Sequence, residues 1–321
     1  MYSLKWGSHV ILAGEVHTGL LQHSHALSAD RVAELLSPAP GERVRQATRP
    51  IPYSVSPEFL SGVDCLLPGT GREIRVIGTA TGRAVVTAGH VLQASSFVSV
   101  DTRPTRGRMP WSHYLAVPGH VIPLSPITSL DLADRFLTGP VTATTPQLNL
   151  GAISSHTMDL VHRSTLLDRR PPFRSTRTRL RWSADDSPTA DGPLRLTIGD
   201  SPLRTLRLSR ESHSIRTIAQ LCEDIAYHDW LLTTLLAIVE RSGIGARQRH
   251  EAVERLGPAV DHLLHLWMPG AHVDPAVARP LWRMLEDRPG FTRQWTSLVD
   301  RVRDQVALAT VPTMEPSQSM H

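Results

Sequence analysis

The stretch LCEDIAYHDWLL, residues 221–232, lies within a long helical pattern and marks the change from strands to helices along the chain. Apolar residues recur at spacings of three and four on one face of this pattern, at Ile215, Ile218, Cys222, Ile225, Leu232, Leu236 and Val239. This spacing predicts an amphipathic helix with Ser214 as its N-cap and Ser242-Gly243 as its end. The middle of the helix also carries Glu223, Asp224, His228 and Asp229.

Asp229 occupies a position where the apolar face expects a hydrophobic side chain. Because burial of an unpaired carboxylate is costly, Asp229 requires a partner, either an Arg or a backbone N–H from another element. We expect Glu223 and His228 on the more solvated flank of the helix. On this interpretation Asp229 is a structural feature first and a site second.

The chain before Arg210 is rich in strand patterns. HVILAGEVHTGLLQHS predicts a strand that Gly14 could divide into two, and a short helix follows with Ser28 as N-cap and Pro38 at its end. β-rich runs then recur as REIRVIGTAT, RAVVTAGHVLQ, SFVSVD, TRTRLRWS, PLRLTI and LRTLRLS. In the last three we expect Leu to face inward and Arg outward, because side chains alternate between the faces of a strand.

After Arg210 only helical patterns remain, in ARQRHEAVERL, in PAVDHLLHLWM with Pro258 at its start, in DPAVARPLWRMLED and in FTRQWTSLVDRVRDQVALA. The length of 321 residues favours two domains. The sequence therefore predicts an α+β protein, with a β-rich domain at 1–210, an all-helical domain at 211–310 and a disordered tail at 311–321.

Composition favours a folded protein, because 40% of the residues are apolar and 20% are charged. A cytoplasmic location is expected from the cysteines, the N-terminus and the apolar runs. Cys65 and Cys222 lie far apart and form no metal or disulfide motif. The N-terminus lacks a signal-peptide pattern, and the longest apolar run is too short to span a bilayer. Lys5 is the sole lysine, so 33 of the 34 basic residues are Arg. This bias is typical of a GC-rich genome and says little about ligands.

Two Asp–His pairs could form a metal site. Asp224 and His228 are four residues apart, and so are Asp261 and His265 in a later helical pattern. If the two helices pack antiparallel, the four side chains could bind zinc, iron or manganese. The alternative is surface Asp–His pairs or capped polar groups in the core. His17, His23 and His25 are three further histidines within nine positions, and we interpret them as surface residues.

An Arg-rich stretch at 163–181 could bind an anion or an acidic partner. It contains Arg163, Arg169, Arg170, Arg174, Arg177, Arg179 and Arg181, interleaved with Phe173 and Trp182, and Arg195, Arg204 and Arg207 could extend it. Nucleic acid is a further candidate ligand, since guanidinium groups neutralise phosphates and aromatic rings stack on bases. The alternative is a solvated Arg face. We interpret the Gly-rich stretches as turns and Cys65 as a core residue.

GEVHTGLLQHS, PGERVRQATRPIPYSVSP, GHVLQASSFV and LCEDIAYHDWLLTTLL together resemble an uncharacterised family of actinobacterial proteins. The resemblance covers most of the chain and carries no known activity. It implies a role in a multi-gene system that includes a variant P-loop protein and a methyltransferase, and hence a partner-dependent function.

The leading hypothesis is a non-catalytic interaction component of a multi-protein system, whose helical C-terminal domain docks a protein partner. Trp267, Met268, Trp282, Met284 and Trp295 are the candidate interface anchors, although the same residues could fill the helical core. The alternatives are a metal-dependent enzyme with the Asp–His pairs and a nucleic-acid-binding protein with the Arg-rich segment. No membrane association is expected.

Overall fold

The structure is a computed structural model that describes residues 10–37, 43–68, 74–103, 107–125, 127, 132–138, 146–186, 194–199, 202–211, 213–243 and 249–310. The chain forms two compact units. One comprises residues 1–230 and 268–282, and the other comprises residues 231–267 and 283–321. The predicted tail at 311–321 lies outside the described residues.

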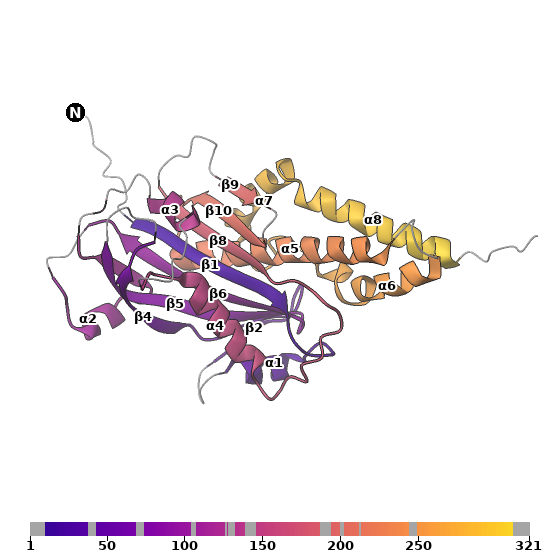
Figure 1. Ribbon diagram of the computed structural model, residues 1–321, viewed down its shortest axis with the longest axis horizontal. Helices are drawn as coiled ribbons and strands as arrows, with labels where there is room; N and C mark the ends of the chain where they lie inside the picture. Colours follow the sequence, from indigo (N-terminus) through magenta and orange to yellow (C-terminus); the bar gives the residue numbers. More distant parts are fainter. Residues whose placement is uncertain are drawn as a thin grey trace, which may run out of the picture. The chain divides into compact units, whose positions relative to one another are not determined.

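The first unit contains a mixed ten-stranded sheet (Figure 1). Its strands are β1 (Val10–Leu20), β2 (Arg45–Ala47), β3 (Tyr53–Val55), β4 (Phe59–Leu66), β5 (Arg75–Thr87), β6 (Val91–Asp101), β7 (His120–Pro123), β8 (Thr178–Asp185), β9 (Leu194–Ile198) and β10 (Leu203–Ser209). Their order is β2-β3-β5-β7-β6-β1-β8-β10-β9, and β4 pairs with β5. Neighbouring strands run antiparallel except β6 with β7 and β8 with β10, which run parallel. The α+β class predicted from the sequence is confirmed.

Helices cover both faces of this sheet. Among the described residues, four helices precede β8, namely α1 (Ala29–Leu36), α2 (Trp111–Leu115), α3 (Leu132–Thr138) and α4 (Leu150–His162). Ser96 on β6 donates a hydrogen bond to the Leu150 carbonyl of α4, at 2.6 Å. Gln93, three positions earlier on β6 and therefore on the other face, donates one to the Glu223 carbonyl of α5 (Ile215–Ser242), at 2.9 Å. The sheet is thus enclosed between α4 on one face, in front in Figure 1, and the first half of α5 on the other.

The boundary between the compact units differs from the expected domain boundary at residue 210. It falls within α5, after Trp230, and residues 268–282 join the first unit. The physical reason is that the first half of α5 contributes side chains to the core on one face of the sheet, where Cys222, Ile225 and Trp230 are fully buried. A change from strand to helix in the sequence therefore does not mark the end of this core.

Several predicted elements are confirmed and others need correction. Ser28 caps α1, where its hydroxyl accepts from the Arg31 N–H, and α5 ends at Gly243 with φ +71°. Gly14 does not divide β1, which is continuous, because a side chain at this position would clash with the Trp182 ring. Pro258 does not begin a helix but lies inside α6 (Arg249–His262).

The second unit is helical in its described part. Besides the second half of α5 it contains α6, a 3-10 turn at Leu264–Leu266, the end of α7 (Pro275–Asp287) and α8 (Phe291–Thr310). α6 packs against α8, and the Trp267 and Trp295 rings stack with centroids 4.6 Å apart. No described helix is both long and apolar enough to cross a membrane.

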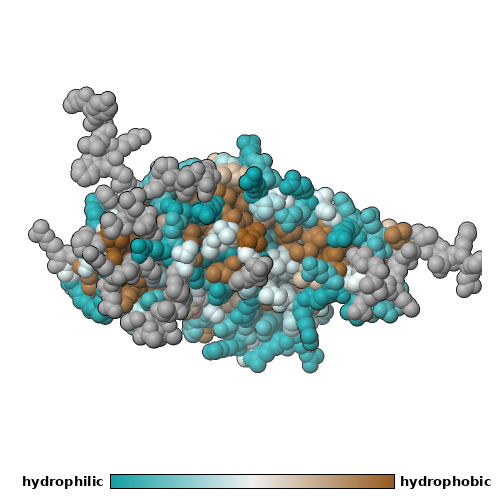
Figure 2. All heavy atoms as spheres, turned by 45° about the horizontal axis from the view of Figure 1, so that its top comes forward, coloured by the Kyte–Doolittle hydropathy of each residue, from teal (hydrophilic) through white to brown (hydrophobic). Residues whose placement is uncertain are grey.

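Exposed large apolar side chains are distributed over several elements, for example Phe59 on β4, Trp111 on α2 and Leu308 on α8. The hydrophobic areas visible in Figure 2 lie between hydrophilic ones. Scattered apolar residues are normal on protein surfaces, so they do not by themselves identify a docking surface.

Candidate anion-binding groove

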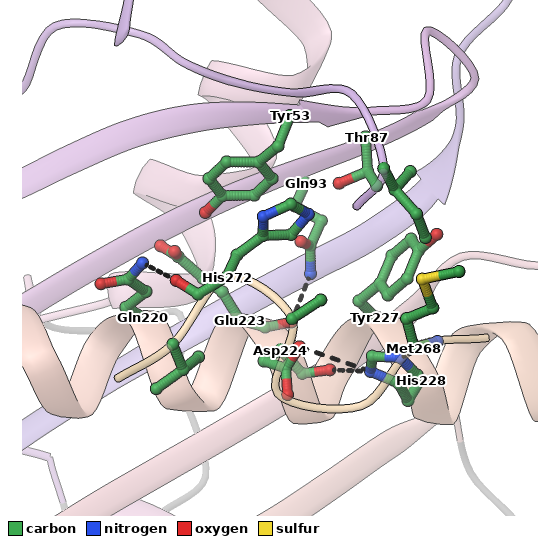
Figure 3. Close-up of a pocket in the computed structure, with 13 residues that line it drawn as sticks. Tyr53, Thr87, Gln93, Gln220, Glu223, Asp224, Tyr227, His228, Met268 and His272 are labelled. Atoms are coloured by element: carbon green, nitrogen blue, oxygen red, sulfur yellow. Dashed lines mark hydrogen bonds and ion pairs between the residues drawn. The ribbon is translucent and has the colours of Figure 1, made fainter. Parts of the chain in front are cut away.

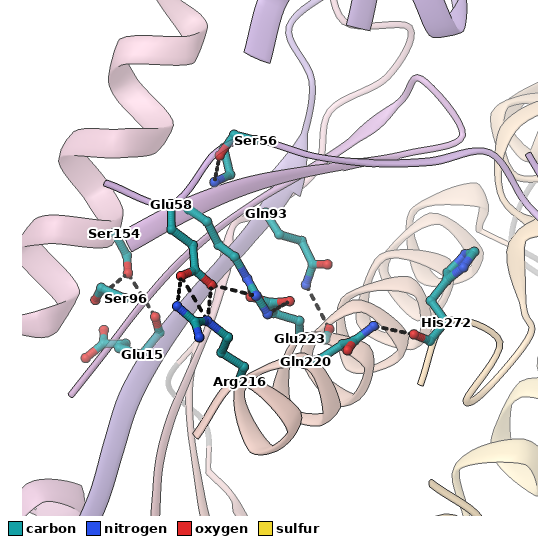
Figure 4. A network of polar contacts seen from close by, with 12 residues as sticks. Glu15, Ser56, Glu58, Gln93, Ser96, Ser154, Arg216, Gln220, Glu223 and His272 are labelled. Carbon is teal, nitrogen blue, oxygen red and sulfur yellow. Dashed lines mark hydrogen bonds and ion pairs between the residues drawn. The ribbon is translucent and has the colours of Figure 1, made fainter. Parts of the chain in front are cut away.

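Glu223 is buried and not solvated as expected. It is 1% exposed, and Arg83 of β5 donates two hydrogen bonds to its carboxylate, at 2.8 Å each (Figure 4). Burial disfavours the charged form of Arg83, but the adjacent Glu223 outweighs this effect and raises the pKa of Arg83. Arg83 also lies near Glu58, which accepts from Arg216 of α5. These carboxylates therefore neutralise Arg83 and join α5 to the sheet.

Asp224 and His228 form a second internal network. Asp224 Oδ2 accepts from the Gly270 N–H and from Trp282 Nε1, at 2.8 Å each. His228 Nδ1 donates to the Asp224 carbonyl at 2.8 Å, which leaves Nε2 to accept from the Met268 N–H at 3.3 Å. Burial lowers the pKa of His228 despite the nearby Asp224, consistent with this neutral tautomer. The pair thus holds segment 268–282 against α5.

Asp229 has the partner that its position requires. Arg204 Nε of β10 lies 3.3 Å from Asp229 Oδ1, and both side chains are buried. Burial raises the pKa of Asp229, while Arg204 partly opposes the shift. The expectation of an Arg from another element is confirmed. The expectation that Glu223 and His228 lie on a solvated flank is wrong, because α5 is covered by the sheet on one side and by segment 268–282 on another.

The predicted metal site gains no support from these contacts. Asp224 and His228 belong to the first unit and are engaged in the hydrogen bonds above, whereas Asp261 and His265 are exposed residues of the second. Among the described residues, no three His, Cys, Asp or Glu side chains form a group that could hold a metal ion. The four-residue site therefore stays a prediction.

The other histidine cluster is also distributed over separate contacts. His17 lies within the sheet and contacts the buried Glu15, with 3.1 Å between His17 Nε2 and Glu15 Oε1. His23 accepts from the Asp168 N–H, and His25 is exposed. The expectation of three surface histidines is thus wrong for His17, whose partner Glu15 lies two residues earlier on the same face of β1.

The Arg-rich stretch does not form one continuous anion-binding face. Arg181 Nε donates to Glu15 Oε2 at 3.0 Å, Arg179 lies 3.8 Å from Glu15, and Arg177 contacts Asp159 and His162 of α4. Arg169, Arg170 and Arg174 lie exposed in the loop before β8. Arg204 does not extend the Arg face but points to the opposite face of the sheet, toward α5. Carboxylates of the same chain thus pair with Arg177, Arg179 and Arg181.

A groove of about 420 Å³ in the first unit offers a different basic site. It is lined by Arg45, Gln46, Ala47, Arg49, Tyr53, Val55, Arg83, Gln220, Ala271, His272 and Val273. Arg45 and Arg49 lie on the β2–β3 hairpin with exposed side chains, and within the described part of the chain neither forms an ion pair. The groove thus combines the neutralised Arg83 with two guanidinium groups that form no ion pair among the described residues, and the charge of Arg45 helps to lower the pKa of the nearby Glu58.

Tyr53 and His272 form an aromatic pair in this groove, stacked with ring centroids 4.2 Å apart and an angle of 14° between the rings (Figure 3). Gln220 of α5 donates to the His272 carbonyl, which fixes the backbone beneath the imidazole. His272 Nε2 is buried and has no hydrogen-bond partner among the described residues. Burial lowers the pKa of His272, against the opposing charge of Asp224.

A small inner cavity of about 20 Å³ adjoins the groove and shares Tyr53, Gln220 and His272 with it. The cavity has room for about one water molecule, which needs at least 10–15 Å³. Its further walls include Thr87, Tyr227 and Met268. A ligand therefore fits in the outer groove, whereas the inner cavity has room only for a group about the size of one water molecule.

No local sequence pattern predicts this groove. Arg45, Arg49 and Tyr53 lie in the Pro-containing run RQATRPIPY, which is typical of a turn. His272 lies more than 200 positions further along and has no motif around it. Comparison with known protein families, characterised proteins and solved structures gave no match. The resemblance to an actinobacterial family therefore stays a prediction.

Proposed function

We propose that this chain is a non-catalytic binding component of a cytoplasmic multi-protein system, and that the groove lined by Arg45 and Arg49 binds an anionic ligand. The observation that carries the proposal is a groove of about 420 Å³ lined by two exposed guanidinium groups that form no ion pair among the described residues. This volume lies in the range of about 300–1,000 Å³ that is typical of small-molecule sites. The multi-protein setting rests on the sequence resemblance alone.

The hydrogen bonds of the carboxylates near the groove, and the protonation of the Cys65 thiol elsewhere in the chain, favour binding over catalysis. Glu223 and Asp224 accept hydrogen bonds from Arg83 and from Gly270 and Trp282, so neither carboxylate is placed to act as a base. Burial raises the pKa of Cys65 to about 11, which keeps this thiol protonated at neutral pH. A metal-dependent enzyme or a Cys nucleophile is therefore the weaker alternative.

The predicted docking of a partner by the helical unit receives little support from its aromatic residues. Trp282 and Trp295 are buried, and Trp267 stacks on Trp295. Of the five candidate anchors, Met268 is the one with an exposed side chain, at 41%. The groove is consequently the better candidate for the binding site.

The proposal is tested by titrating the full-length protein with phenyl phosphate, benzoate and inorganic phosphate in a calorimeter. We expect at least one of the three anions to bind to the wild type. Arg45→Gln and Arg49→Gln should each weaken that binding about tenfold or more, since a hydrogen bond to a charged group contributes about 1.5–3 kcal/mol.

Arg103→Gln is the matched control, because it removes one positive charge from an exposed side chain that does not line the groove. Its affinity should equal that of the wild type. Absence of binding by all three anions, or equal losses in all three variants, would refute an anion site in this groove.

A further inference from the structure

The groove carries more hydrogen-bond donors than a carboxylate ligand needs. Besides Arg45 and Arg49, the groove is lined by Tyr53 and His272, and neither the Tyr53 hydroxyl nor the buried His272 Nε2 has a hydrogen-bond partner among the described residues. Burial raises the pKa of Tyr53, so its hydroxyl stays protonated. His272 donates in the tautomer that carries its proton on Nε2.

The two carboxylates beside the groove already accept hydrogen bonds. Glu223 accepts two hydrogen bonds from Arg83, and Asp224 accepts from a backbone N–H and from Trp282. A buried donor without a partner is unfavourable and calls for an acceptor from a ligand or water. The free donors of the groove therefore favour a ligand with several acceptor oxygens.

The donors also reach the groove from two sides. Arg45, Arg49 and Tyr53 belong to the β2–β3 hairpin, whereas His272 belongs to the segment held against α5. One guanidinium fork satisfies both oxygens of a planar carboxylate. A terminal phosphate has three acceptor oxygens that point in different directions and carries about 1.5 to 2 negative charges. The two-sided arrangement suits the phosphate better.

We infer that the ligand of this groove is a small organic phosphate, held by Arg45 and Arg49 and distinguished from a carboxylate by Tyr53 and His272. This inference rests on the proposed function and names the ligand class of the same site. Val55, Ala271 and Val273 give the groove apolar walls for the organic part of the ligand. The Tyr53–His272 stack and the Gln220 hydrogen bond fix both specificity residues before the ligand binds, which reduces the entropy lost on binding.

The test compares phenyl phosphate with benzoate, because both carry the same ring and differ in the anionic group. Calorimetry of the full-length wild type should show phenyl phosphate binding about tenfold more tightly or better, since leaving buried donors without partners is penalised. Tyr53→Phe and His272→Phe retain an aromatic ring but remove a donor. Each should weaken phenyl phosphate about tenfold and leave benzoate within about twofold.

Tyr227→Phe is the control, since Tyr227 lines the inner cavity and not the groove. Its affinity for both ligands should match the wild type. If the wild type binds the two ligands with equal affinity, the phosphate assignment is overturned but an anion site remains. If it binds neither of them and no inorganic phosphate, the proposed function itself is refuted. The wild-type comparison decides the question even if a variant fails to fold.

Discussion

At the scale of single residues, Asp229 shows how a carboxylate on the apolar face of a helix becomes part of the core. The interrupted apolar pattern predicted that this carboxylate needs a partner, and Arg204 provides it. The sequence could not identify which arginine, because Arg204 alternates with Leu on β10 and looked like a solvated residue. Strand alternation predicts which residues share a face but not which face the next helix covers.

We expect that Arg204 and Asp229 can be replaced together by apolar residues with little loss of stability, but that replacing one of them alone is costly. Asp229→Leu alone should destabilise the protein by about 3–5 kcal/mol, because it leaves Arg204 buried without its carboxylate. Combining it with Arg204→Met should recover most of that loss. Urea unfolding of the two single variants and the double variant measures the coupling. Simple additivity of the single losses would contradict the pairing.

Glu15 should contribute a pH-dependent part of the stability. Burial disfavours its charge, but His17 and Arg181 outweigh burial and lower its pKa. Because the pKa of Glu15 is lower in the folded state, its charge stabilises the folded state at pH values above the ordinary Glu pKa of about 4.3. This stabilisation is lost as the pH falls through the pKa of Glu15 in the folded state. Glu15→Gln should thus cost about 3 kcal/mol at pH 7, and the difference from wild type should shrink below about pH 4.3.

Urea unfolding at neutral and acidic pH checks the Glu15 prediction. Glu34→Gln is a suitable control, since Glu34 forms an exposed pair with Arg31 and surface pairs contribute about 0–1 kcal/mol. A difference between wild type and Glu15→Gln that stays constant with pH would show that the charge of Glu15 is not what stabilises the fold.

At the scale of elements, periodicity located the long strands and the helices α1 and α5 to α8, whereas the helices α2, α3 and α4 and the strands β2, β3, β4 and β7 were not predicted. Other errors arose where one residue suggested a break. Gly14 suggested a divided strand and Pro258 a new helix, yet β1 and α6 continue through them. The presence of Gly at position 14 follows from packing against Trp182, a contact between residues 168 positions apart that no local pattern contains. Local propensity is thus overridden by tertiary contacts.

Gly14→Ala should be costly for the same reason. A Cβ at Gly14 would lie 2.4 Å from the Trp182 ring, which is fully buried and cannot move away freely. We expect a loss of about 1–3 kcal/mol, as for other overpacked cores. Gly62→Ala on β4 is the matched control, because its Cβ would meet Trp111 at an ordinary 3.4 Å. In thermal unfolding, the Tm of Gly14→Ala should lie well below that of the wild type, and the Tm of Gly62→Ala should lie close to it. The reverse order would contradict this packing.

At the scale of the whole molecule, the number of arginines indicates less about where an anion binds than the ion pairs that these arginines form. The 34 basic residues are nearly balanced by 30 acidic ones, and strand arginines that suggested an anion face pair with carboxylates of the same chain, such as the buried Glu15, the partly exposed Asp159 and the exposed Asp134. Arg45 and Arg49 remain without such partners among the described residues, on a hairpin that composition did not single out. The candidate site was not predictable because it depends on which charges remain unpaired after folding.

This distribution of charge leads to a prediction about salt. Binding of phenyl phosphate should weaken several-fold when NaCl rises from about 0.05 to 0.5 M, because exposed charges are screened over shorter distances at higher ionic strength. The Arg45→Gln/Arg49→Gln double variant should bind weakly with little dependence on salt. Tyr53→Phe removes a neutral donor, so it should lower the affinity at every salt concentration while keeping the wild-type slope. Titrations at four salt concentrations separate the two effects. An unchanged slope in the double variant would mean that the attraction comes from charges outside the groove.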